Sequence, residues 1–184
     1  MSKNVRFAIK TITFCAIFIA LAVIMARFLA VAPSESVRFS FESVPIFLSG
    51  VLFGPIAGAM VGFCSDFLGC LFSPYGFNPL LSFPPVLYGI FGGIFQCFLA
   101  KKVSFFRILL SLLPPVVLGS ILVQSFVLNY LYGSGFLVLL SARSIQFAVV
   151  LVLDALLIRI LFKSKVLGTA RLWPPAPRKK EGLT

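Results

Sequence analysis

Three arginines lie apart from the other basic residues of this chain and are the first candidates for chemistry. Arg27 lies near the end of the first apolar segment, Arg38 soon after it, and Arg143 near the start of the last one. A guanidinium holds a carboxylate through two parallel hydrogen bonds, so this set suits an anionic solute. The same arginines could instead form structural salt bridges with the acidic residues Glu35, Glu42 and Asp66.

Amide and aromatic side chains near these arginines suit a flat heterocycle. Amides offer both a donor and an acceptor, and rings in loops can cover a planar ligand. Arg143 and Gln146 are three residues apart, which places both on one helical face. Interhelical hydrogen bonding is the alternative use of such amides, and we assign it to Gln96 and Gln124. The candidate substrate-binding residues are Arg27, Arg38, Phe39, Tyr75, Phe77, Asn78, Asn129, Arg143 and Gln146.

Several chemistries find no support in the residue types. The sequence has no histidine, no GxxxxGK[ST] loop and no HExxH pair, so neither an ATPase nor a metalloprotease is indicated. Cys15, Cys64, Cys70 and Cys97 lack CxxC spacing and are interpreted as small buried residues. Asp154 is assigned a structural or interfacial role. We therefore expect no enzyme activity, no metal and no cofactor.

Composition indicates an integral membrane protein. Hydrophobic residues make up 60% of the 184, charged residues only 11%, and mean hydropathy is +1.09. Soluble domains carry about 25% charged residues. Because a spanning helix needs about 20 residues, the expected fold is all-α, with six transmembrane helices in one compact bundle. The predicted domain covers 1–165, and a basic cytoplasmic tail covers 166–184.

Proline and glycine divide the apolar sequence into six segments. The second should be too short to cross alone, because Gly54-Pro55 ends it. Pro84-Pro85 should kink the fourth helix or delay its start. The expected helices cover residues 8–30, 44–53, 56–72, 80–100, 108–131 and 137–162.

A stripe of small residues runs through the second and third segments. Gly50, Gly54, Gly58 and Gly62 are followed by Asp66, all at four-residue spacing. Such spacing lets a neighbouring helix approach closely, so we expect helix packing here. A charge at membrane depth costs about 2.5–3.5 kcal/mol and faces a bundle interior or a wet cavity. Asp66 is therefore either part of an ion pair between helices or a cavity wall near a solute site.

Positive charge predicts the orientation. Thirteen of the sixteen basic residues fall before or at the start of the first helix, between the fourth and fifth, or at the end of the sixth and beyond. These positions share one side of a six-helix protein, and the positive-inside rule makes that side cytoplasmic, with both termini. The net charge of +11 then needs no nucleic acid to explain it.

The glycine-rich segment resembles a known family. Arg38-Phe39-Ser40-Phe41, Pro45-Ile46 and the run from Gly50 to Gly69 are similar to the substrate-binding S components of energy-coupling factor (ECF) vitamin transporters, most of all the folate-specific type. Tyr75-Gly76-Phe77 and Tyr88-Gly89 extend the similarity, which covers residues 10 to 162. The small residues Ala16, Ala20, Ala22 and Ala26 resemble the surface by which S components dock on their coupling subunit.

The resemblance implies a multi-pass protein of a bacterial cell membrane that captures a vitamin, here folate, from outside. It implies partners as well: a transmembrane coupling subunit and two ATPase subunits, which deliver the vitamin. Two alternatives stay open. The vitamin could be another one, such as pantothenate or thiamine, or the chain could be a membrane scaffold of the cell-shape type with no ligand.

Overall fold

The computed structural model describes residues 3–34, 37–72, 78–96, 104–132 and 136–163. Within them, six helical stretches follow one another in the order that the sequence predicts. Tyr75 and Phe77, two of the predicted site residues, lie outside the described residues, as does the basic tail.

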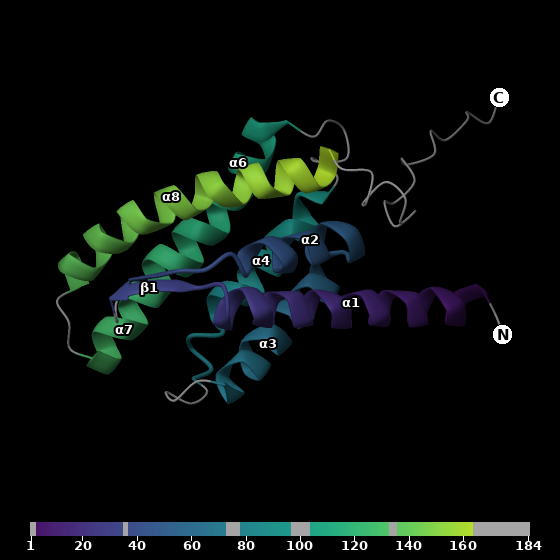
Figure 1. The fold of residues 1–184 in the computed structure, drawn as a ribbon, viewed down its shortest axis with the longest axis horizontal. Helices are drawn as coiled ribbons and strands as arrows, with labels where there is room; N and C mark the ends of the chain where they lie inside the picture. Colours follow the sequence, from purple (N-terminus) through teal and green to yellow (C-terminus); the bar gives the residue numbers. More distant parts are fainter. Residues whose placement is uncertain (1–2, 35–36, 73–77, 97–103, 133–135, 164–184) are drawn as a thin grey trace, which may run out of the picture.

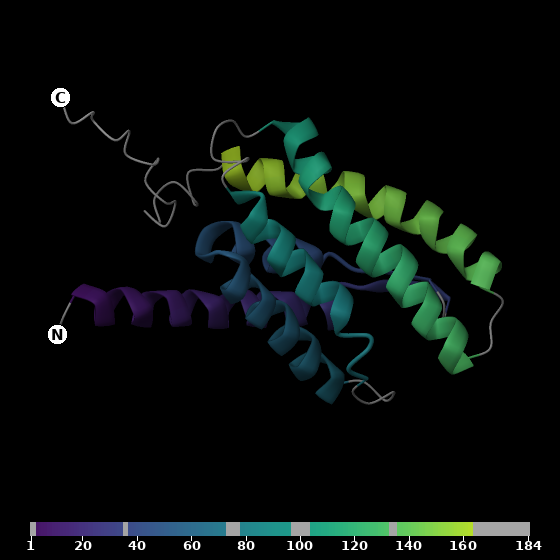
Figure 2. The same ribbon diagram turned by 180° about the vertical axis from the view of Figure 1, so that it is seen from behind.

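The helices form two groups that pack against each other (Figures 1 and 2). The first group contains α1 (Lys3–Arg27), α2 (Ser43–Phe53), α3 (Pro55–Leu71) and α4 (Phe83–Ile94). The second is a helical hairpin of one long rod and α8 (Phe136–Lys163). The rod is continuous through α6 (Phe105–Pro115), the π-helix η1 (Val116–Val123) and α7 (Gln124–Tyr132). α4 joins the groups by packing on both α6 and η1.

A short antiparallel hairpin follows α1, in a segment for which the sequence predicts no strand. Its strands are β1 (Val31–Ser34) and β2 (Val37–Phe39), with Val31 opposite Phe39. β2 contacts α8, so this connection lies across the bundle beside the last helix (Figure 1).

Three helices among the described residues are long and apolar enough to span a membrane: Ile9–Arg27, Phe105–Tyr130 and Arg143–Lys163. α2, α3 and α4 are shorter apolar helices. The residues that begin α1 and end α8 lie at the same end of the molecule (Figure 1), as the predicted orientation requires.

Proline and glycine determine the helix boundaries. α2 ends before Gly54, whose φ of +95° favours glycine, and Pro55 is the first residue of α3. α4 begins at Phe83, later than the predicted residue 80, because its two prolines suit only a first helical turn. In the long rod, Pro114 and Pro115 lie inside the helix, and the π-helical stretch starts immediately after them.

Glycine backbones bring α2, α3 and α4 into close contact. A methyl group at Gly50 or at Gly58 would collide with the Gly89 carbonyl group, and one at Gly62 with the Pro85 carbonyl group. α3 against α4 is the most extensive helix pair of the fold. Gly54 differs from the expected packing role: apart from its immediate neighbours in the sequence, no atom of the described residues lies within 4 Å of the position of an added methyl group, and the residue serves the turn.

Candidate binding site

The inner face of α8 carries both polar and apolar buried residues. Arg143, Gln146, Val150, Asp154 and Ile158 are all buried, at helical spacings of three or four residues. Arg143 and Gln146 come from the first part of the helix, two polar residues at one end of a stripe that finishes in the apolar Ile158. We call the end of the bundle near β2 and the start of α8 the polar end, after these two residues; the third polar residue of the stripe, Asp154, lies one turn before Ile158.

Arg143 is the most informative member of this stripe. Its side chain is only 7% exposed, and its Nε has no hydrogen-bond partner among the described residues. Buried guanidinium groups require acceptors, because an uncompensated charge in an apolar interior is costly. Gln146 lies one turn further along and is 5% exposed. The sequence prediction that one helical face presents both residues agrees with their common burial.

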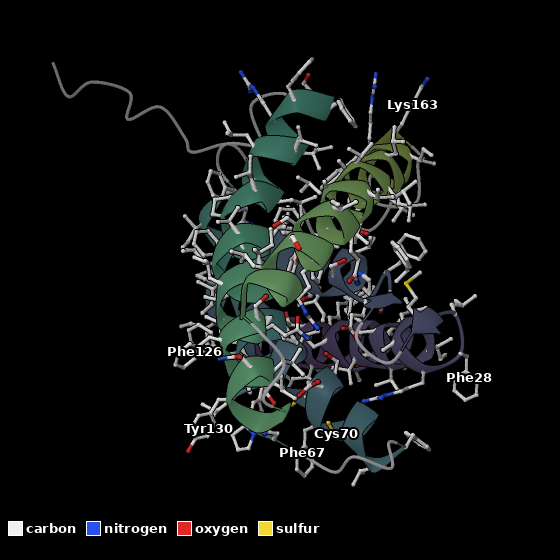
Figure 3. All side chains as sticks on the ribbon, turned by 90° about the vertical axis from the view of Figure 1, so that its left-hand side faces the viewer. Phe28, Phe67, Cys70, Phe126, Tyr130 and Lys163 are labelled. Carbon is white, nitrogen blue, oxygen red and sulfur yellow. The ribbon has the colours of Figure 1, made fainter. Side chains whose placement is uncertain are left out.

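Arg27 lies in a different environment. Its Nη2 is 4.0 Å from the Cys70 sulfur, and Cys70 is in turn 4.0 Å from Asp66 Oδ2. Gly69 leaves room for the guanidinium, since an added Cβ there would lie 3.2 Å from Arg27 Nε. Arg27 therefore packs across the contact between α1 and α3. Figure 3 shows Cys70 near the end of α3, beside Phe67.

Asp66 has a structural partner. Its Oδ2 accepts a hydrogen bond of 2.5 Å from Ser82 Oγ, just before α4. Together with the contact to Cys70, this bond connects α3 to α4 and α1. Of the two interpretations left open, the geometry favours the contact between helices, with a serine hydroxyl as the partner in place of a cation.

The remaining predicted residues are dispersed. Asn78 Oδ1 accepts the Leu80 N–H at 3.1 Å and so stabilises the turn before α4. Asn129 is half-buried on α7, and Phe39 is half-buried at the end of β2. Arg38 is in β2, on the strand that contacts α8. The structure thus groups Arg143 and Gln146 on one face and places Arg27 and Asn78 in packing and turn contacts.

The small residues of α1 divide into two pairs. Ala16 and Ala20 are exposed, whereas Ala22 and Ala26 are 0% and 5% exposed within the chain itself. The proposed partner surface is corrected accordingly: Ala22 and Ala26 are already covered by neighbouring helices, and only Ala16 and Ala20 remain accessible. Phe14 and Phe18 also face inward, with ring centroids 6.2 and 6.3 Å from that of Phe53 in α2.

Two buried polar contacts and one buried serine were not predicted. Ser43 donates a hydrogen bond to Asp154 Oδ2, which joins α2 to α8, and the Tyr88 and Ser120 hydroxyls are 3.2 Å apart, joining α4 to η1. Ser125 in α7 is 0% exposed. The only sequence signal for them was the presence of polar residues inside apolar segments.

Aromatic rings at the polar end point outward. Phe126 and Tyr130 extend from α7 away from the bundle, and Phe28 does so from the end of α1 (Figure 3). Their exposed fractions of 64%, 78% and 77% agree with this view. These rings therefore face the surroundings of the protein and do not cover Arg143.

Comparison with known proteins now decides the family. A family model described as "ECF-type riboflavin transporter, S component" matches residues 6–163. The chain belongs to this family. The resemblance seen in the glycine-rich segment is thus confirmed, and the protein is a transporter S component, not an enzyme.

Two similar proteins are named as folate transporters. The "Folate transporter FolT" of Clostridium novyi (strain NT) is 30% identical over 155 residues, which are 82% of this chain and 86% of that protein. A solved structure, "Crystal structure of FolT bound with folic acid", matches with a TM-score of 0.73 and 25% identity. It covers 83% of this chain and 92% of that chain. The all-helical membrane bundle is therefore the fold of this S component as well.

Proposed function

We propose that this S component binds folate on the outer side of a bacterial cell membrane and delivers it to an ATP-driven ECF module. The observation that carries the choice of vitamin is Arg143, a buried guanidinium whose Nε has no partner among the described residues. Folate has a flat pterin and a glutamate tail with two carboxylates. A carboxylate would supply both the charge and the acceptors that Arg143 requires.

The other vitamins suit Arg143 less well, because of their charge or their shape. Riboflavin, named by the family model, is the second candidate, but it is neutral and would leave Arg143 without an anion. Thiamine is a cation and would be repelled by the guanidinium. Pantothenate has a carboxylate but no flat ring. A scaffold without ligand gives no reason for a buried arginine with an unused donor.

Delivery requires partners, because the sequence has no phosphate-binding loop of its own. We infer a transmembrane coupling subunit and two ATPase subunits, with the exposed Ala16 and Ala20 of α1 as part of the docking surface. Residues of α1 around them are also exposed and apolar, among them Ile12 at 69% and Ile17 at 49%. A flat apolar helix face of this kind suits another membrane helix.

The test is the effect of Arg143→Ala on the affinity of purified protein for folate and for pteroate, which lacks the glutamate. A hydrogen bond to a charged group contributes about 1.5–3 kcal/mol. We expect the substitution to weaken folate binding about ten- to a hundredfold, measured by titration calorimetry in detergent, and pteroate binding much less. Equal losses for the two ligands would remove Arg143 from the tail site.

A further inference from the structure

Ser125 differs from the other buried serines of the described chain. Three of them bond side chains of other elements: Ser43 with Asp154, Ser82 with Asp66 and Ser120 with Tyr88. Another three donate to a carbonyl oxygen of their own helix at 2.6–2.9 Å: Ser49, Ser65 and Ser111. Ser125 is 0% exposed, yet its Oγ has no hydrogen-bond partner among the described residues.

This hydroxyl lacks even the usual bond to its own helix. A serine in a membrane helix ordinarily donates to the carbonyl oxygen three or four residues earlier, and exposed Ser144 does so with Leu140 at 2.7 Å. Ser125 is the second residue of α7, one residue beyond the turn in which the Gln124 N–H bonds the Gly119 carbonyl five residues back. π-Helical turns of this kind are frequent at functional sites. A buried hydroxyl without a partner needs an explanation such as a bound group.

Ser125 and Arg143 lie at the same depth. α7 ends at Tyr132, and α8 starts at Phe136, where the chain turns back. Ser125 lies seven residues before the end of α7, and Arg143 lies seven residues after the start of α8. At 1.5 Å per residue this is about 10 Å below those ends. α7 and α8 contact each other along the hairpin, and both side chains are buried. Two adjacent helices thus each place an unused polar group inside the bundle at one level.

We propose that Ser125 is a substrate-binding residue that donates its hydroxyl to the same ligand carboxylate as Arg143. This inference depends on the proposed function. A carboxylate has about four acceptor positions on two oxygens, so it can take the guanidinium and the hydroxyl together. The hydroxyl adds directionality without a second charge, and an anion of this geometry would satisfy both orphaned groups at once.

The test compares Ser125→Ala with Ser111→Ala, a matched serine of the same rod that is also 0% exposed but bonded to its own backbone. We expect Ser125→Ala to weaken folate binding about tenfold and Ser111→Ala to change it less than about twofold. The melting temperature without ligand should stay the same or rise in Ser125→Ala, because an unpaired buried hydroxyl is removed. Loss of ligand-free stability with unchanged affinity would mean a structural role and overturn the inference.

A double-mutant cycle with Arg143→Ala tests the shared carboxylate. If both side chains hold one group, Ser125→Ala costs less affinity in the Arg143→Ala background than in the wild type. Fully additive losses would contradict a shared carboxylate. Failure of the proposed function looks different, because the wild-type protein itself would then not bind folate.

Discussion

Gly89→Ala offers a sharp test of how the helices pack. An ideal Cβ at Gly89 would lie 2.7 Å from the Ala59 amide nitrogen and still closer to the Gly58 carbonyl group. All of these atoms belong to the backbone of α3, so no side chain can rotate away, and the two helices must separate. Overpacking of this kind costs about 1–3 kcal/mol or more.

Gly69→Ala is the matched control for this substitution. Its added Cβ would lie 3.2 Å from Arg27 Nε and Nη2, the far end of a flexible side chain that can shift. For a domain of this size, each kcal/mol moves the melting temperature by about 2–4 °C. We therefore expect Gly89→Ala to lower it by about 2–12 °C, and Gly69→Ala by much less, in a thermal-shift assay on detergent-purified protein. A Gly89→Ala protein that melts with the wild type, or a larger loss in Gly69→Ala, would refute the reasoning.

Three further predictions concern the partners, the orientation and the buried acid. Ala20→Trp should abolish uptake of folate in cells that coexpress ECF subunits and leave folate affinity nearly intact. Ile160→Trp, at an exposed position of α8, should leave uptake intact, and equal effects of the two substitutions on uptake would contradict a docking surface on α1. In a variant without native cysteines, Cys introduced at positions 76 and 135 should react with an impermeant thiol reagent on intact cells, and labelling at position 103 instead would overturn the orientation. Asp154→Asn should preserve the melting temperature, because the asparagine oxygen can still accept the hydrogen bond from Ser43. Asp154→Leu should lower the free energy of unfolding by about 1–3 kcal/mol, because the Ser43 hydroxyl is left buried and unpaired. A larger loss of stability in Asp154→Asn than in Asp154→Leu would exclude the hydrogen bond as the stabilising contact.

Most of the helical architecture was predictable, because proline and glycine act through the local backbone. Gly54-Pro55 ends one helix and starts the next wherever it occurs in an apolar run, and the structure has this boundary within one residue. Four-residue spacing of Gly50, Gly58 and Gly62 likewise predicts close packing from helical geometry alone. Which helix they meet was not predictable: the partner, α4 with Gly89, depends on the tertiary arrangement.

Assigning side chains to the site was harder. Ala22 and Ala26 have the same type and spacing as Ala16 and Ala20, yet they face inward, because spacing alone does not distinguish the lipid side of a helix from the bundle side. Arg27 and Arg143 are alike in sequence, and the Nε of each is buried without a partner among the described residues. They differ in their surroundings: Arg27 Nη2 contacts Cys70, whereas Arg143 shares a buried helical face with Gln146. Ser125 belongs to no sequence motif that would mark it as a binding residue. Its significance comes only from the absence of a partner in three dimensions.

The central claim is that this S component binds folate through an anionic group, and titration calorimetry on the purified wild-type protein tests it most directly. Folate and riboflavin would be titrated side by side in the same detergent. We predict saturable, one-to-one binding of folate and no measurable binding of riboflavin. Binding of riboflavin without folate would contradict the account, because a neutral ligand would leave the buried Arg143 without the anion on which the assignment depends.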